Sequence, residues 1–206
     1  MDVYVALTGL PACGKETFKD LLFLAATERG FQNHHISFTD VLRDECVRRG
    51  VECNRENYTN IANALRSEFG SDILAERIVE KVQGVQAQQQ ASRLFVLEAV
   101  RNPREADLFR SRLGNGFALV GITAPRELLI ERIRTRKRLD EQPGVMDSRA
   151  AAEALLDREW GVNQPETGLR VGDCLAVSDF LIDNSGDLQS LEMQVRRLLA
   201  RLRGEA

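Results

Sequence analysis

One short segment near the amino terminus strongly limits the folds that this chain can adopt. The apolar run VYVAL (3–7) leads into Gly9, then Gly14 and Lys15 follow, and residues 15–29 have the apolar spacing of a helix. Glycines allow the main chain to wrap closely around an anion, and the start of a helix adds partial positive charge. The segment therefore predicts a strand, a phosphate-binding loop and a helix in direct succession. The alternative is an ordinary strand–helix turn that carries an exposed lysine.

The rest of the chain alternates short apolar segments with longer helical patterns. The segments that read as strands are 3–7, 35–38, 94–97, 118–122 and 180–182. Helical patterns cover 15–29, 40–49, 58–82 with a break near Gly70, a stretch opening at Pro125, 147–160 and 188–202. Near-continuous apolar strands are typical of a parallel sheet that is buried on both faces. We therefore predict an α/β protein: a three-layer α/β/α fold with a five-stranded parallel sheet, in one domain over 1–206.

Composition argues against several classes of function. The chain has 206 residues, a net charge of −3, and ordinary shares of hydrophobic (43%) and charged (29%) residues. An acidic chain has no global attraction to nucleic acid or to an anionic membrane, and no apolar run approaches the ~20 residues that span a bilayer. Four cysteines without a C-x-x-C pair, and no secretory signal, favour reduced thiols and a cytoplasmic location over a zinc site.

The full loop pattern is G-x-P-x-x-G-K-x-T, from Gly9 to Thr17. It resembles adenylate kinase and its relatives among the nucleoside-monophosphate kinases of the P-loop class, in which a threonine follows the lysine by two positions. The resemblance implies ATP and Mg²⁺ as cofactors, with Lys15 as a catalytic residue at the β- and γ-phosphates and Thr17 at the metal. The loop residues that it places at the nucleotide are Gly9, Pro11, Ala12, Cys13, Gly14, Lys15, Glu16 and Thr17. Ala12 stands where the family usually has glycine.

Glu16 occupies the position at which a simpler P-loop often has its metal-binding hydroxyl. A carboxylate turned toward the phosphates would repel them, whereas an acid in the first helical turn interacts favourably with the helix dipole. We therefore predict that Glu16 points outward.

Two further segments resemble the acceptor side of adenylate kinases. In HISFTDVLRDE (35–45), Asp40 has the position of a helix N-cap and Arg43 lies one turn later. The resemblance implies that both bind the acceptor, with Arg43 on its phosphate. It also implies that Glu98, at the end of a predicted strand, holds magnesium through water, and that Arg101 meets the transferred phosphate. The alternative for Arg43 is a solvent-exposed surface arginine, and the alternative for Glu98 is a strand-terminal acid that caps the next turn.

A basic helix follows the fourth predicted strand. Its spacing P-x-E-L-x-x-x-R-x-x-x-R, from Pro125 to Arg136, resembles the adenylate-kinase helix that leads into the lid. The resemblance implies that Arg132 flanks the adenine of ATP, that Arg136 contacts phosphates, and that a short lid covers about 134–150. Arg158 is a further substrate-side candidate. The basic run could also suggest nucleic acid, but it has no interleaved aromatic residues for base stacking.

The segment VSDFLIDNSGDLQSL (177–191) resembles the last strand and turn of dephospho-CoA kinases. The resemblance implies that Asn184 and Gly186 contact the base. The alternative is a simple turn closed by Asp187 as the N-cap of the last helix.

The resemblance covers most of the chain in the same order and is nearest to adenylate-kinase-related and dephospho-CoA-kinase-like proteins. We predict a phosphotransferase that moves the γ-phosphoryl group of Mg-ATP to a nucleotide-type acceptor, bound by the helical region 40–82, in a monomer or homodimer. A dephospho-CoA kinase remains an alternative, with Asp40 as the first candidate for a general base. A nucleotide-binding regulatory module or slow NTPase is a second alternative. It stays open because Ala12, Glu16 and Glu98 differ from the residues usual in the family.

Overall fold

The computed structural model describes residues 2–87, 92–98, 100–135 and 148–204. Its centre is a five-stranded sheet in the spatial order β2-β3-β1-β4-β5, and every neighbouring pair is parallel. The strands are β1 (Asp2–Thr8), β2 (Gln32–Ser37), β3 (Arg93–Glu98), β4 (Phe117–Thr123) and β5 (Phe180–Asp183). The predicted α/β class and parallel sheet are confirmed.

Helices connect the strands and follow them along the chain. In the described ranges they are α1 (Lys15–Thr27), α2 (Phe38–Arg49), α3 (Arg55–Phe69), α4 (Ile73–Gln86), α5 (Pro103–Leu113), α6 (Arg126–Thr135), α7 (Arg149–Trp160), α8 (Val171–Ala176) and α9 (Leu188–Leu202), with a short 3-10 turn η1 (Gly114–Gly116). No helix in these ranges is both long and apolar enough to cross a lipid bilayer.

The helices depart from the sequence prediction in three places. α5 and α8 were not predicted, although α5 has a complete start signal: Asn102 caps it, Pro103 opens it and Glu105 closes a capping box. α8 has six residues, too few for a helical period to show. The prediction of Asp40 as an N-cap is wrong. Ser37 is the N-cap of α2, and Asp40 is its N3 partner in a capping box.

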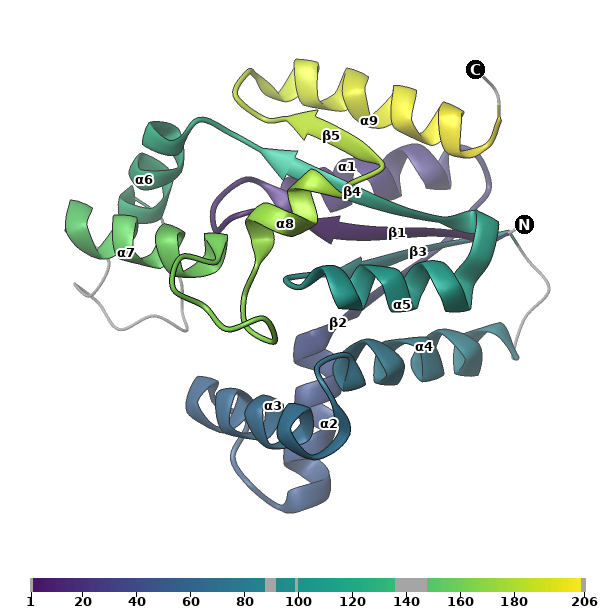
Figure 1. Cartoon of the computed structure of the whole chain (residues 1–206). Helices are drawn as coiled ribbons and strands as arrows, with labels where there is room; N and C mark the ends of the chain where they lie inside the picture. Colours follow the sequence, from purple (N-terminus) through teal and green to yellow (C-terminus); the bar gives the residue numbers. More distant parts are fainter. Residues whose placement is uncertain (1, 88–91, 99, 136–147, 205–206) are drawn as a thin grey trace.

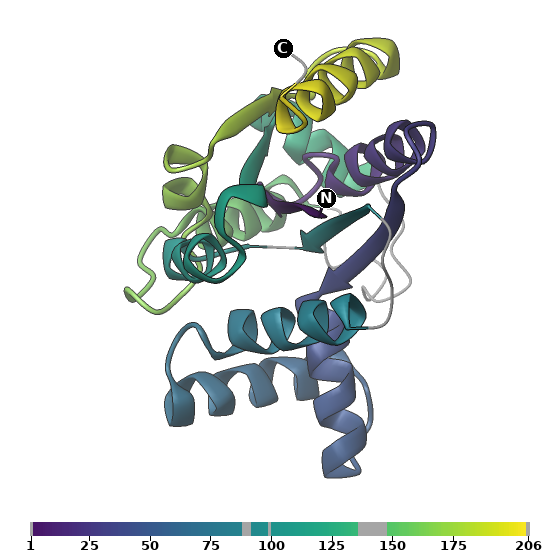
Figure 2. The same cartoon turned by 90° about the vertical axis from the view of Figure 1, so that its right-hand side faces the viewer.

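Two helical layers bury the two faces of the sheet (Figures 1 and 2). α1 and α9 lie together on one face, and α4 and α5 cover the other. Alternate residues of β1 enter opposite cores, since Val5 and Leu7 pack in the cluster of α1 and α9 whereas Tyr4 and Ala6 pack in that of α4 and α5. Because the central strand is buried on both faces, its sequence is continuously apolar.

The carboxyl ends of the strands meet at one edge of the sheet, on the left of Figure 1. The loop after β1 emerges there, and α6 and α7 lie beyond it. α2 and α3 form a helical pair below the sheet in the same view. Open parallel sheets bind ligands outside this edge, where successive connections leave in opposite directions. The fold therefore directs attention to the loop between β1 and α1.

Candidate active site

The loop between β1 and α1 depends on glycine at two positions. Gly9 has a φ of +146°, and a Cβ there would lie 2.4 Å from the carbonyl oxygen of Ile122. Gly14 has a φ of +98°, and a Cβ there would lie 2.1 Å from the side-chain nitrogen of Asn184. A side chain at either position would collide with its neighbour in a backbone conformation that L-residues rarely adopt. Ala12 also has a positive φ, 63°, which costs energy that the usual glycine would avoid.

The start of α1 has no side-chain cap. The helices α2, α3, α5, α7 and α9 each begin with a Ser, Asn or Asp side chain that accepts a first-turn N–H, whereas Gly14 at the N-cap of α1 provides none. The Nζ of Lys15 donates to the carbonyl oxygens of Gly9 (2.8 Å) and Leu10 (3.2 Å), so the ammonium lies against the loop. Uncapped helix N–H groups combined with a lysine ammonium suit the binding of phosphate.

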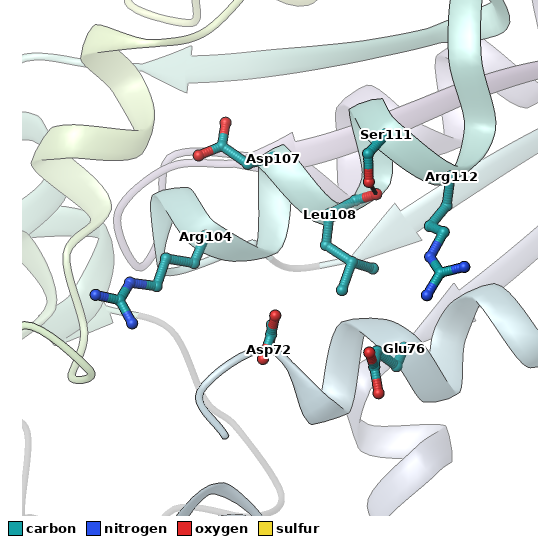
Figure 3. A pocket seen from close by; sticks show the side chains of 7 residues that line it. All are labelled: Asp72, Glu76, Arg104, Asp107, Leu108, Ser111 and Arg112. Carbon is teal, nitrogen blue, oxygen red and sulfur yellow. Dashed lines mark hydrogen bonds between the residues drawn. The ribbon is translucent and has the colours of Figure 1, made fainter. Parts of the chain in front are cut away.

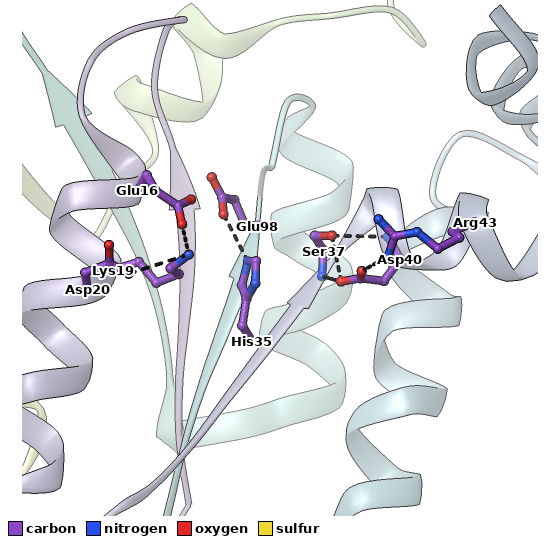
Figure 4. Close-up of polar contacts among 8 residues, drawn as sticks. All are labelled: Glu16, Lys19, Asp20, His35, Ser37, Asp40, Arg43 and Glu98. Atoms are coloured by element: carbon purple, nitrogen blue, oxygen red, sulfur yellow. Dashed lines mark hydrogen bonds and ion pairs between the residues drawn. The ribbon is translucent and has the colours of Figure 1, made fainter. Parts of the chain in front are cut away.

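Glu16 and Thr17 follow in the first turn of α1, and both are exposed. The Glu16 side chain is 69% exposed and forms an ion pair with Lys19, whose side chain is 9% exposed (Figure 4). Burial alone would lower the pKa of Lys19, but the hydrogen bond and charge of Glu16, together with the charges of Asp20 and Glu98, outweigh burial, and the pKa is raised. The predicted outward position of Glu16 agrees with this geometry, because its carboxylate serves a nearly buried lysine.

Glu98 ends β3 beside the loop and has a partner that the sequence did not suggest. The Nε2 atom of His35, in β2, lies 3.0 Å from its Oε2 atom (Figure 4). Burial alone would raise the pKa of Glu98, but the hydrogen bond with His35 and the charges of His35, Lys15 and Lys19 together outweigh burial, so the pKa is lowered. Glu98 is therefore held as a carboxylate next to the lysines of α1. Since β2 and β3 are neighbours, a histidine near the end of β2 was the available signal.

Asp40 and Arg43 form one polar unit at the start of α2 (Figure 4). The Oδ2 atom of Asp40 accepts hydrogen bonds from the backbone N–H (2.9 Å) and hydroxyl (2.7 Å) of Ser37. Its Oδ1 atom accepts one from Nη1 of Arg43 (2.9 Å). Burial would raise the pKa of Asp40, but these hydrogen bonds and the charge of Arg43 outweigh it, and the pKa is lowered. Tyr58 of α3 lies beside the guanidinium of Arg43, whose side chain is 54% exposed.

Arg101 and Arg158 meet at a residue that the sequence analysis did not select. The Oε1 atom of Glu159 lies 3.5 Å from Nη1 of Arg101 and 3.7 Å from Nη2 of Arg158. The Glu159 side chain is 7% exposed, and the two arginine side chains are about half exposed. The structure therefore brings together two predicted site residues from different elements.

Asn184 connects three parts of the structure at the carboxyl ends of the strands. Its side-chain N–H donates to the carbonyl oxygen of Cys13 at 2.8 Å, its backbone N–H donates to Thr123 at 2.8 Å, and its carbonyl oxygen accepts Nη2 of Arg132 at 3.1 Å. The Nη1 atom of Arg132 is buried and has no hydrogen-bond partner among the described residues. Asn184 thus links the end of β4, the helix α6 and the loop after β1.

The remaining predicted residues are placed less fully. Gly186 lies in the turn after β5, and Asp187 is the N-cap of α9, as the alternative interpretation of this turn expected. Arg136 and most of the predicted lid, 134–150, lie outside the described residues. Among the described residues, no group of three His, Cys, Asp or Glu side chains could hold a metal ion, so Thr17 and Glu98 would need further ligands from phosphate or water.

A groove between α4 and α5 contains none of the predicted site residues (Figure 3). Acidic and basic side chains alternate along it; its lining residues are Asp72, Glu76, Arg104, Asp107, Leu108, Ser111 and Arg112. It does not include the loop after β1, and it adds nothing to the candidate site.

Comparison with known proteins places the chain in a family. No protein-family model matches it. A UPF0200 protein from Methanothermobacter thermautotrophicus is 32% identical over 200 residues, which cover 97% of this chain and 90% of that one. The chain belongs to the UPF0200 protein family. A second UPF0200 protein, from Aeropyrum pernix, is 34% identical over 194 residues, which cover 94% of this chain and 90% of its own length.

Solved structures agree on the fold of this UPF0200 protein. The shikimate kinase from Aquifex aeolicus matches 98% of this chain and 97% of its own, with a TM-score of 0.51 and 14% identity. The protein APE1195 matches 98% of this chain and 96% of its own, with a TM-score of 0.57 and 17% identity. At such identities the likeness concerns the fold alone, and that fold is the one of P-loop kinases.

Proposed function

We propose that this UPF0200 protein is a phosphotransferase that moves the γ-phosphoryl group of Mg-ATP to a nucleotide-type acceptor. The observation that carries the proposal is the loop after β1, with two glycines that admit no side chain, an uncapped helix start and Lys15. A main chain without Cβ atoms at these points can bring its N–H groups against phosphate oxygens. The loop supports a bound phosphate chain, and the fold of P-loop kinases supports its transfer.

The residues around the loop fit Mg-ATP. A buried donor without a partner costs about 1–3 kcal/mol, and Nη1 of Arg132 is such a donor. An acceptor atom of the nucleotide would offset this cost. Thr17 and Glu98 supply hydroxyl and carboxylate oxygens, the donor type that Mg²⁺ prefers, and the ion would neutralise phosphate charge. Lys15 and the loop N–H groups would hold the β- and γ-phosphates, with Arg136 as a further phosphate contact.

The acceptor would bind on the other side of Glu98. We assign Arg43, positioned by Asp40, and the pair Arg101 and Arg158 to its phosphate. In this arrangement the chain acts as one domain with an acceptor-binding helical region at about 40–82 and a short lid at about 134–150. Catalysis would depend on positioning and on neutralisation of charge by the lysine, the arginines and the metal. The enzyme would act in the cytoplasm, as a monomer or homodimer, without a nucleic-acid or membrane partner.

A hydroxyl acceptor, as in dephospho-CoA, fits less well. It would need a general base, for which Asp40 is the candidate. The carboxylate of Asp40 already accepts hydrogen bonds on both oxygens, and its pKa is lowered. Both properties make it a weak base, so a phosphate acceptor, which needs no base, is the better fit.

The test is ADP formation measured with a panel of ribo- and deoxynucleoside monophosphates and dephospho-CoA. One acceptor should stimulate turnover strongly, and Lys15→Ala should abolish it. Arg43→Ala should raise the KM for that acceptor about tenfold or more, because a hydrogen bond to a charged group contributes about 1.5–3 kcal/mol. Arg48→Ala is the matched control, since Arg48 is also an exposed arginine of α2 that pairs with an acid, Glu45, but has no proposed role at the acceptor. A slow rate that is equal across the whole panel would contradict the kinase proposal and favour a regulatory nucleotide-binding module or slow NTPase.

A further inference from the structure

Glu159 lies where a carboxylate is energetically unfavourable. It is the penultimate residue of α7, at the negative end of the helix dipole, and its side chain is 7% exposed. Burial and the dipole both disfavour a negative charge at this position. The two cations on its Oε1 atom, Arg101 at 3.5 Å and Arg158 at 3.7 Å, offset those costs. The three side chains therefore form one electrostatic unit.

The main chain of Arg101 is fixed on both sides. Its N–H donates to Oε2 of Glu105 (2.9 Å), a carboxylate that is 2% exposed, and its carbonyl oxygen accepts the N–H of Arg170 (2.7 Å). Arg66 of α3 lies 3.8 Å from the other oxygen of Glu105 and supplies the balancing charge. Since the backbone is held, the direction of the Arg101 guanidinium depends on what its side chain contacts, and among the described residues Glu159 is its hydrogen-bond partner.

The two arginines remain open to solvent above a buried carboxylate. Their side chains are 50% and 51% exposed. Glu159 cancels one of the two positive charges, so the unit keeps a net charge of +1 and the repulsion between the guanidinium groups is offset. A guanidinium has five N–H donors in a planar fork, so each arginine can contact Glu159 and still donate to a phosphate oxygen.

We propose that Glu159 is a positioning residue, and that it holds Arg101 and Arg158 together as a two-arginine clamp for one phosphate group, the phosphate monoester of the acceptor. The inference rests on the proposed function for the identity of the acceptor. Phosphate binding by the two arginines does not depend on whether the protein transfers a phosphoryl group to any acceptor.

The test is the affinity for inorganic phosphate, measured by calorimetry with the loop after β1 saturated by a non-hydrolysable ATP analogue, and repeated in a Lys15→Ala background. Arg101→Ala and Arg158→Ala should each weaken phosphate binding about tenfold, in line with the loss of a charged hydrogen bond. Glu159→Gln separates two explanations by the sign of its effect. Charge alone predicts tighter binding, because a negative charge is removed, whereas the positioning role predicts binding about fivefold weaker.

Glu153→Gln is the matched control, because Glu153 is an exposed carboxylate of the same helix that pairs with Arg149. It should change phosphate affinity less than twofold. In an Arg101→Ala background, Glu159→Gln should weaken phosphate binding less than it does in the wild type, because only Arg158 is left for Glu159 to hold. General destabilisation would not produce this coupling. If Glu159→Gln does not fold, Glu159→Asp keeps the charge but shortens its reach and should also weaken binding.

Phosphate bound by Glu159→Gln as tightly as by the wild type, or more tightly, would overturn the inference. So would equal losses from Glu159→Gln in the presence and absence of Arg101. The phosphate measurements do not require turnover. An equal, slow rate across the acceptor panel would contradict the kinase proposal but not the clamp. Stimulated turnover together with unchanged phosphate affinity in Glu159→Gln would contradict the clamp but not the kinase proposal.

Discussion

The contact between Gly14 and Asn184 allows a quantitative prediction. The amide nitrogen of Asn184 donates to Cys13 at 2.8 Å and lies 2.1 Å from the position that a Cβ on Gly14 would take. Gly14→Ala must therefore displace the amide and break a buried hydrogen bond, at a cost of about 1–3 kcal/mol. The positive φ adds about 1–2 kcal/mol for an L-residue. We expect the free energy of unfolding to fall by about 2–5 kcal/mol in total.

Gly50→Ala is the matched control for the backbone term. Gly50 has a φ of +66°, and a Cβ there meets nothing within 4 Å, so the substitution should cost the conformational term of about 1–2 kcal/mol alone. Urea unfolding followed by circular dichroism measures both variants. The same assay on Gly14→Ala in an Asn184→Ala background should return a cost close to that of Gly50→Ala, because the obstructing amide is gone. Equal costs for the two glycine variants in the wild-type background would refute the reasoning.

Three further predictions concern single side chains. Glu16→Gly should change Mg-ATP affinity less than about twofold, because Glu16 pairs with Lys19, and it should lower stability by about 1 kcal/mol, because glycine is a poor helix former. A fluorescent ATP analogue and urea unfolding measure the two effects, and a tenfold loss of affinity would make Glu16 a metal ligand. The hydrogen bonds of Arg48 hold the pKa of Glu45 at about 2, against an ordinary value of 4.5. The contribution of ionised Glu45 to the free energy of unfolding is therefore complete above pH 4.5 and is lost as the pH falls through about 2. The difference between Glu45→Gln and the wild type in urea unfolding should therefore shrink between these pH values, and a constant difference would speak against it. Cys53 is exposed whereas the other three cysteines are buried, so it should account for the rapid reaction of the native protein with a disulfide reagent; a rapid phase that survives in Cys53→Ser would show that a buried thiol reacts.

The strands at the centre of the sheet were easier to predict than β2, one of its two edge strands. β1 and β3 are buried on both faces, so their apolar runs marked them nearly residue by residue. β2 pairs with β3 alone and begins with the polar residues QNH, so the sequence pattern detected its last residues and missed its start. α5 was missed for a related reason, since few of its residues are buried and its apolar stripe is short.

The geometry of the loop after β1 could be predicted from the sequence because its requirements are local. The positive φ values of Gly9 and Gly14 and the helix that follows depend mainly on neighbouring residues. Asp40 shows the limit of such reasoning. Asp40 and Arg43 do contact each other in the first turns of α2. The N-cap, however, is Ser37, because α2 begins directly after the last residue of β2. His35 and Glu159, which hold Glu98 and Arg101, carried no motif and were not selected.

The sequence by itself determined the class of fold and the glycine-dependent loop after β1, because alternating apolar segments and a glycine-bounded turn are properties of contiguous residues. Only the tertiary structure decided which charges face one another. Arg101 and Glu159 are 58 residues apart, and Asn184 and Cys13 are 171 apart. Such pairs form because the sheet order and the packing of α7 and β5 bring their elements to the end of the sheet at which the carboxyl ends of the strands lie. The sequence shows that Glu159 lies near the end of a helix, but it does not show that Arg101 lies beside its carboxylate.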